Sequence, residues 1–282
     1  MVVLATAGSV ACSLAYSSNL NDARAGQDSS SEAGTSPEDG GTQGDASVDA
    51  DAGDAGSARG CGAYVPAPKY CRDFDDGAQI DADGWAIETA PAAGEHTVSI
   101  DTSTAYSSPG SLEANLIDPA PCSFSRLSRS FSGIGSERVE VRFMIRPTRP
   151  WGNSDGAFAF ELDRVGAYCQ GIYYLRPAAQ LGQIQSVEVN MQSGTPLGND
   201  VRPLNGTPPV DEWTEIGIVA VPVDGGGVSF TYSFTRENGN VERTTHVYGD
   251  CRLGGNLTLK LGFHCEDGAG EVRYDDLRVD WK

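Results

Sequence analysis

The chain has 282 residues and a formal net charge of −19, with 39 acidic residues against 20 lysines and arginines. Nucleic-acid binding needs a basic stripe, and adsorption to anionic lipid headgroups needs basic residues too, so this balance argues against both partners. The length allows one large or two modest domains, and the uneven composition along the chain favours one.

The N-terminal stretch has the character of an export signal. Residues 1–20 carry no charge, and residues 1–16 are apolar and small, too short to span a bilayer but suited to the core of a signal peptide. The segment SVAC, which ends at Cys12, resembles the lipobox of bacterial lipoproteins, with Ser9 where that box usually has leucine. The resemblance implies lipidation of Cys12, and Ser13 after it implies the outer membrane. The alternative is an ordinary signal peptide that is removed together with Cys12.

Residues 21–60 have the composition of a flexible spacer. They contain nine acidic residues and two arginines, a net charge of −7, and almost no apolar side chain larger than alanine. Such a segment buries too little surface to offset its chain entropy, so we expect a disordered linker. The linker would hold a folded head, residues 61–282, away from a lipid anchor.

Residues 61–282 alternate apolar and polar residues and show no helical periodicity beyond a turn or two. Alternation predicts half-buried antiparallel strands, because neighbouring side chains of a strand point to opposite faces. The clearest predicted strands are residues 138–146, 157–163, 186–192, 214–221 and 257–263. The Asn238-Gly239 pair predicts a hairpin between residues 228–235 and 241–247. The same pattern assigns to the core Trp85, Trp213, Trp281, Phe230, Tyr232 and Phe234.

A family resemblance agrees with this pattern. The segments CRDFDDG, TAYSSPGSLEANL, RLSRSF, VEVRFMIRP, DEWTEIGIVAV and VRYDDLRVDW follow one another along residues 70–282. In this order they resemble a concanavalin A-like jelly-roll domain, which shares its sandwich with laminin-G-like modules and several glycan-binding and glycan-cleaving proteins. The resemblance implies an all-β sandwich of two antiparallel sheets and a carbohydrate or another extracellular polymer as partner.

Six cysteines lie in the folded part, an even number that indicates disulfides in an exported chain. No two of them have the CxxC spacing of a zinc or redox site. Six cysteines allow about fifteen pairings. The expected pairing closes short local loops first, and it is Cys61–Cys71, Cys251–Cys265 and Cys122–Cys169.

The sequence holds no complete catalytic set. Glu161 and Asp163 begin the ExDxxE pattern of retaining jelly-roll glucanases, but the position of the general acid holds Val165 or Gly166. Retaining hydrolysis needs two carboxyl groups about 5 Å apart, so we expect no catalysis here. The three histidines are scattered and lack metal-ligand spacing.

A glycan-binding face is the first functional hypothesis. Sugar rings stack on aromatic side chains, and their hydroxyls bond to amides and carboxylates. The candidate residues that offer these groups are Trp151, Glu161, Asp163, Tyr173, Glu188, Asn190 and Gln192. A solvated strand surface is the alternative for Glu161 and Asp163. A structural or adhesive envelope protein without a small ligand is the second hypothesis, and an enzyme acting on glycans is the third.

Adjacent aspartates suggest a structural calcium site. The strand alternation slips by one residue at Asp275-Asp276, which predicts a β-bulge. If the first and last strands pair, Asp75 lies beside this bulge, and partly buried carboxylates need a cation or hydrogen-bond donors. The jelly-roll modules that this chain resembles hold calcium with an N-terminal acid and a C-terminal aspartate. Calcium held by Asp75, Asp275 and Asp276 is one hypothesis, and capping of turns by the same residues is the other.

Overall fold

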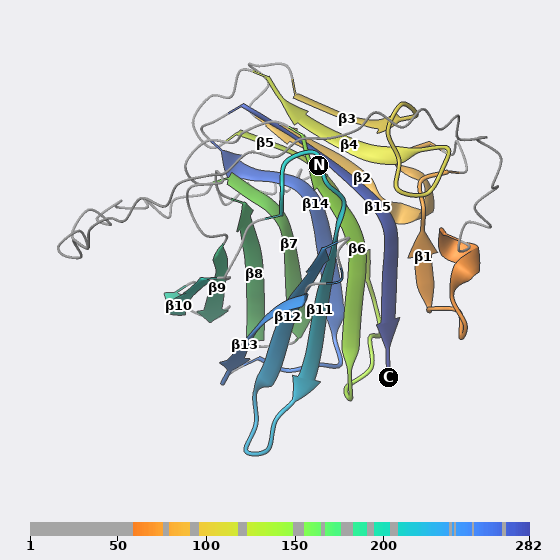
Figure 1. Ribbon diagram of the computed structural model, residues 1–282. Coiled ribbons are helices and arrows are strands. Elements are labelled where there is room, and N and C mark those ends of the chain that lie inside the picture. Colours follow the sequence, from red (N-terminus) through yellow and green to blue (C-terminus); the bar gives the residue numbers. More distant parts are fainter. Residues whose placement is uncertain are drawn as a thin grey trace, which may run out of the picture. The chain divides into compact units, whose positions relative to one another are not determined.

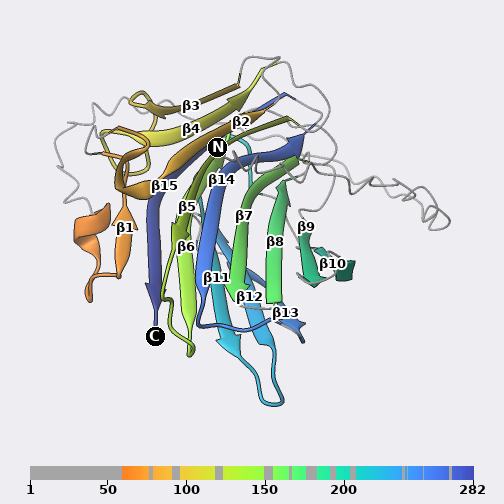
Figure 2. The same ribbon diagram turned by 180° about the vertical axis from the view of Figure 1, so that it is seen from behind.

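The computed structural model describes residues 59–75, 79–90, 96–117, 123–148, 155–164, 167–175, 183–190, 195–203, 208–236, 239, 241–249, 251–266 and 269–282. Within these ranges the chain is almost entirely β-strand and contains no α-helix, only two short 3₁₀ turns at Cys61–Ala63 and Ala82–Gly84. Figures 1 and 2 show two sheets stacked face to face, seen from opposite sides. The expected antiparallel two-sheet sandwich is confirmed. In this described part, no helix has the length and hydropathy to cross a membrane.

Sheet A has eight strands, seven of them in the order β13-β12-β11-β6-β15-β4-β3, with β1 paired to β15 beside this path. Its strands are β1 (Tyr70–Arg72), β3 (His96–Asp101), β4 (Ser111–Leu116), β6 (Val139–Pro147), β11 (Thr214–Pro222), β12 (Val228–Arg236), β13 (Val241–Tyr248) and β15 (Gly270–Trp281). The pairing of β1 with β15 brings the N-terminal segment beside the last strand, as the sequence suggested.

Sheet B has seven strands in the order β10-β9-β8-β7-β14-β5-β2. Its strands are β2 (Ala86–Ala90), β5 (Ser123–Phe131), β7 (Asp155–Arg164), β8 (Ala167–Leu175), β9 (Gln183–Asn190), β10 (Thr195–Pro203) and β14 (Asn256–Glu266). Consecutive strands often lie in different sheets, so residues far apart in the sequence become neighbours within one face.

The predicted strands form where the alternation placed them. The five clearest predicted segments coincide with β6, β7, β9, β11 and β14, although β9 ends at Asn190 and leaves Met191 and Gln192 outside the described residues. The predicted hairpin is the pair β12–β13, which is in register from Val228 opposite Tyr248 to Thr235 opposite Val241. Gly239 in its turn has φ 78°, a left-handed backbone that glycine adopts readily.

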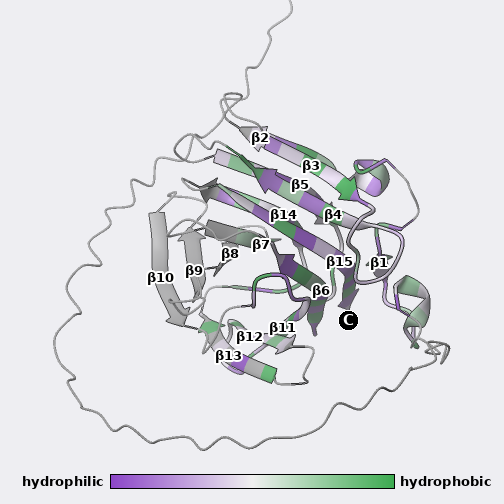
Figure 3. Cartoon of the chain, turned by 45° about the horizontal axis from the view of Figure 1, so that its top comes forward, coloured by the Kyte–Doolittle hydropathy of each residue, from purple (hydrophilic) through white to green (hydrophobic). Residues whose placement is uncertain are grey.

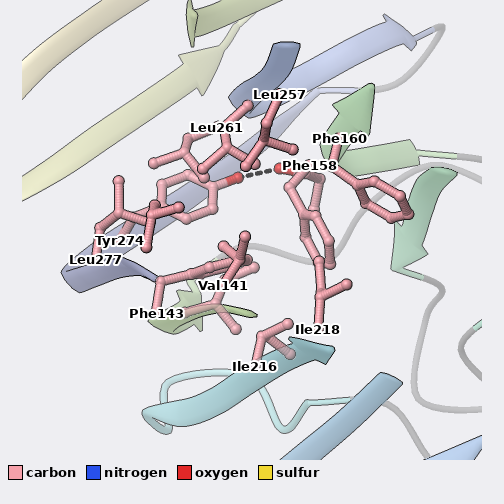
Figure 4. Packing of buried hydrophobic residues seen from close by; sticks show 14 of the residues in the cluster. Val141, Phe143, Phe158, Phe160, Ile216, Ile218, Leu257, Leu261, Tyr274 and Leu277 are labelled. Carbon is pink, nitrogen blue, oxygen red and sulfur yellow. Dashed lines mark hydrogen bonds between the residues drawn. The ribbon is translucent and has the colours of Figure 1, made fainter. Parts of the chain in front are cut away.

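The core lies between the two sheets and is rich in aromatic side chains. Phe143 of sheet A meets Phe158 of sheet B edge to face at 4.9 Å between ring centroids, and Figure 4 shows these rings among the surrounding aliphatic side chains. The Tyr274 hydroxyl donates to the Ala157 carbonyl, so this buried polar group is bonded across the interface (Figure 4). Full burial of an apolar side chain such as phenylalanine stabilises the folded state by about 1.5–3 kcal/mol.

The expected core aromatics are placed as predicted, with one difference. Phe230, Tyr232 and Phe234 are buried, and so are Trp85 and Trp213, whereas Trp281 is only partly buried and packs against the edge of the core. Figure 3 shows hydrophilic and hydrophobic bands alternating along strands such as β14. This alternation sends every second side chain of a strand away from the core.

The disulfide between Cys61 and Cys71 is formed, with the two Cα atoms 5.6 Å apart. It closes a short loop as expected and joins the segment before β1 to β1 itself. Cys251 is also disulfide-bonded. The side chains of Cys122, Cys169 and Cys265 lie outside the described residues, as do Cys12 and residues 21–58 of the linker, so the remaining pairings and the lipid anchor stay predictions.

Candidate functional site

Sheet B carries ionisable side chains on the face turned away from the core. In β14, Leu259 and Leu261 belong to the core, so alternation turns Lys260 to the opposite face, and His264 follows the same phase. We call the resulting set the charged row. It runs across four adjacent strands, β7, β14, β5 and β2, and consists of Glu161, Lys260, His264, Arg126 and Glu88.

Two ion pairs connect neighbouring strands within the charged row. Glu161 of β7 pairs with Lys260 of β14, and these side chains are only 13% and 15% exposed. Arg126 Nε of β5 lies 2.7 Å from Glu88 Oε2 of β2. Because the first pair is largely shielded from water, salt screens it less than a pair on an open surface. The row is therefore a set of fixed charges that are partly shielded from water.

His264 is buried and contacts Arg126. Its Nδ1 is 2.8 Å from Arg126 Nη1. A guanidinium can only donate, so Nδ1 must accept, and the imidazole is neutral with its proton on Nε2. Burial lowers the pKa of His264 well below its usual 6.5, and the charges of Arg126 and Lys260 lower it further. Geometry and electrostatics agree that this histidine is uncharged near neutral pH.

The structure places the predicted ligand residues only in part. Glu161 belongs to the charged row, while the side chains of Asp163, Tyr173, Glu188 and Asn190 lie outside the described residues, as do Trp151 and Gln192 altogether. Backbone register gives one further fact about them. Glu161 pairs with Gln170, which pairs with Val187, whereas Glu188 lies on the rung of Cys169.

The predicted bulge at Asp275 and Asp276 is confirmed. The register of β15 with β6 shifts between Asp275 and Arg278, and Asp276 has φ 49°, a left-handed backbone. Aspartate tolerates this region better than most residues. Both aspartates are buried, at 0% and 1% exposure, which a regular strand on this face would not produce. The bulge turns both carboxylates inward, and we call them the aspartate pair.

Donors from two distant segments satisfy the aspartate pair. Asp275 Oδ2 accepts from the backbone amides of Tyr106 at 2.8 Å and Ser107 at 2.9 Å. Asp276 Oδ2 accepts from the amide of Gly60 at 3.3 Å and from the hydroxyl of Tyr64 at 3.5 Å. The remaining oxygens accept from the Ser107 hydroxyl and from the Asp276 amide. The pair thus joins the N-terminal segment and the loop before β4 to the last strand.

The same geometry tests the fit to calcium. Each oxygen of the aspartate pair accepts a hydrogen bond, and Asp75 Oδ1 accepts from the amide of Gly110 at 2.8 Å. Across the described residues, no three acidic, histidine or cysteine side chains gather as a metal site would require. The arrangement fits the turn-capping hypothesis better than a cation site, and calcium binding stays an untested alternative.

Burial raises the pKa of Asp275 to about 7, and the charge of Asp276 adds to this, while the amides of Ser107, Asp276 and Tyr106 oppose it. The Ser107 hydroxyl lies 3.2 Å from Asp275 Oδ1 and 2.8 Å from Asp276 Oδ1, but it has one proton and donates to one oxygen at a time. The pair therefore holds a proton near neutral pH more readily than isolated aspartates do.

Sequence reasoning missed most of the charged row. Lys260 was visible as a polar position in an alternating strand, but nothing local marked it as the partner of Glu161, 99 residues away. Arg126 and His264 are separated by 138 residues and meet only because β5 pairs with β14. The signal that would have found them is the sheet order, which alternation alone does not give.

Several solved structures share this fold. One is an endo-β-1,4-glucuronan lyase from Trichoderma reesei, with 13% identity over 76% of this chain and 96% of that chain, and a TM-score of 0.55. An alginate lyase from Aplysia kurodai has 8% identity over 76% and 99% of the two chains, and a TM-score of 0.54. A cellulose-induced protein has 16% identity over 76% and 98%, and a TM-score of 0.52. At these identities the similarity shows the fold alone. No protein-family model matches the chain, and no curated protein matches its sequence.

Proposed function

We propose that the domain of residues 61–282 is a carbohydrate-binding module without catalytic activity. The observation that carries the proposal is the charged row, a set of fixed, partly shielded donors and acceptors on a face that the core does not use. The similar structures support a carbohydrate partner, because two are named as lyases of glucuronan and alginate and one as induced by cellulose. This support is an analogy between folds.

The chemistry of the row suits sugar hydroxyls. A hydroxyl both donates and accepts, so a surface that recognises it needs donors beside acceptors. Arg126 and Lys260 donate, while Glu88 and Glu161 accept, and their mutual pairing holds each side chain in place. Neighbouring strands are about 4.8 Å apart, so the four strands span roughly 14 Å, enough for more than one sugar ring.

The geometry supports binding without catalysis. The two carboxylates of the row lie on β7 and β2, which are three strand spacings or roughly 14 Å apart, whereas retaining hydrolysis needs about 5 Å. The lone pair of His264 Nδ1 accepts from Arg126, so this nitrogen is already used and is poorly placed to act as a base. Neither arrangement offers the acid–base pair of a glycan-cleaving enzyme.

Display outside the cell belongs to the same proposal. It rests on the lipobox-like segment at Cys12 and on the acidic spacer that follows. Labelled palmitate should be incorporated into the full chain in a bacterial host, and Cys12→Ala should release the protein from membranes. Retention of that variant in the membrane fraction would contradict the anchor without affecting the binding proposal.

A glycan array probed with the full chain carrying Cys12→Ser tests the binding proposal, since no lipid then contributes. The double variant Arg126→Gln, Lys260→Met should lose at least about tenfold in affinity, equivalent to about 1.4 kcal/mol. Arg243→Gln, an exposed cation on β13 of the other sheet, is the control and should bind as the unmodified chain does. Unchanged binding by the double variant would mean that the glycan binds to another part of the chain. Failure to bind any glycan would favour the structural or adhesive alternative.

A further inference from the structure

We propose that the charged row selects uncharged glycans and disfavours glycans that carry carboxylates, an inference that rests on the binding function proposed above. The first step is the charge of the row. Among the described side chains it holds two cations, Arg126 and Lys260, and each of them pairs with a carboxylate of the row, Glu88 or Glu161. The fifth member, His264, is neutral. The row is dense in charge but has no net charge.

Each cation of the described row therefore already has a counter-ion, so a carboxylate on a ligand would have to compete with Glu88 or Glu161 for it. To bind Lys260 it would have to displace Glu161, whose side chain is only 13% exposed. Displacement would break an ion pair that is largely shielded from water, and separating a shielded ion pair is strongly unfavourable. A sugar hydroxyl has no such conflict, because it adds a donor and an acceptor to the existing pairs without disturbing them.

The charge of the whole chain acts in the same direction. A formal net charge of −19 repels a polyanion before contact and lowers its rate of association. An anion-binding protein with such an excess of acid would need a local positive patch to overcome it. The described part of the row supplies none, since each of its cations faces a carboxylate.

Matched polymers test the inference. Glucuronan and alginate are compared with their carboxyl-reduced forms, which keep the linkages but replace each carboxylate with a hydroxymethyl group. We expect the full chain to bind at least one reduced polymer at least about tenfold more tightly than its parent, with little dependence on salt. Tighter binding to the parent polymers, weakened by salt, would overturn the inference but leave carbohydrate binding intact. Binding to no polymer, on these or on the glycan array, would overturn both.

A gain-of-function variant locates the selectivity in the row. Glu88→Gln with Glu161→Gln leaves Arg126 and Lys260 without counter-ions, so affinity for the parent polymers should rise by about tenfold and become sensitive to salt. The control is Glu137→Gln with Glu212→Gln, which makes the same change in net charge at exposed positions of the loops before β6 and β11. An equal gain in the control would show that the overall charge, not the row, sets the preference. If circular dichroism shows that the row variant does not fold, the binding of parent and carboxyl-reduced polymers to the unmodified chain still tests the inference.

Discussion

The charged row and the aspartate pair are two clusters of ionisable side chains that are shielded from water. Shielding a charge costs free energy, and the two clusters offset this cost in different ways. In the row, charges of opposite sign on regular strands neutralise each other, as Glu161 and Lys260 do. In the aspartate pair, two carboxyl groups sit side by side at a bulge, and backbone amides and hydroxyls from distant segments bond to them. The first arrangement leaves side chains that a ligand can join. The second uses its bonding capacity to hold the fold together.

The comparison predicts that stability depends more on the aspartate pair than on the row. We expect Asp276→Ala to lower the free energy of unfolding by about 3 kcal/mol, because it leaves the Gly60 amide and the Tyr64 hydroxyl without the carboxylate oxygen that both bond to. Urea denaturation measures the change. Asp276→Asn should cost less, since asparagine keeps an acceptor and tolerates the left-handed backbone.

Asp280→Ala serves as the control for this experiment. The Asp280 carboxylate lies near the end of the same strand and accepts a hydrogen bond from the amide of the next residue, Trp281. Its effect should stay within about 0.5 kcal/mol. Similar losses in Asp276→Ala and Asp280→Ala would mean that the bulge has no special structural role.

The two clusters should respond to pH in opposite directions. The pKa of Asp275 rises on folding from 3.8 to about 7, so its contribution to stability is complete below 3.8 and is lost as pH rises towards 7. The pKa of His264 falls on folding, so its contribution is complete above 6.5 and is lost as pH falls below that value. Each group alone changes the free energy of unfolding by at most about 1.4 kcal/mol per pH unit.

Unfolding measured between pH 4 and 8 separates these contributions. Asp275→Asn should show a steeper loss of stability in acid than the unmodified chain, because the variant lacks the opposing contribution of Asp275. His264→Gln should show the reverse, a loss as pH rises. Parallel pH profiles for both variants and the unmodified chain would contradict the ionisation states assigned to the two clusters.

A double-mutant cycle on Glu161 and Lys260 measures how much one ion pair of the charged row contributes to stability. We expect a coupling of about 1 kcal/mol between Glu161→Gln and Lys260→Met, because both side chains are mostly shielded. The pair Arg138 and Glu140 has side chains 44% and 25% exposed and is the matched control, with a coupling of about 0.3 kcal/mol. Equal couplings would show that shielding from water does not strengthen the ion pairs of the row.

The smallest effect concerns calcium. Because hydrogen bonds occupy the oxygens of Asp275 and Asp276, we expect melting curves with added calcium and with chelator to coincide. A ligand that binds only the folded state would stabilise it by about 2.7 kcal/mol at a concentration of 100 times its Kd. A shift of that kind, abolished by Asp276→Ala, would establish the calcium site instead.

Local pattern predicted local structure well in this chain. The slip of alternation at Asp275-Asp276 was readable because a bulge changes the order of apolar residues within one strand. The partners of that bulge were not readable, since Gly60 lies 216 residues away and is brought there by the pairing of β1 with β15. The charged row shows the same limit, because His264 looks like an ordinary strand residue until β5 is placed beside it.

The disulfide between Cys61 and Cys71 has a mechanical consequence. A pull on the chain from its N-terminal side reaches Cys61 and passes through the disulfide to Cys71 in the middle of β1, so the residues between them carry no load. Their separation of 10 residues would otherwise yield about 30 Å of extra length on stretching, since the two Cα atoms are 5.6 Å apart. The force is applied instead to the hydrogen bonds between β1 and β15 and to the contact of Gly60 with Asp276. A pull from the N-terminal side therefore bypasses the residues between Cys61 and Cys71 and is borne directly by the contacts of β1 with sheet A.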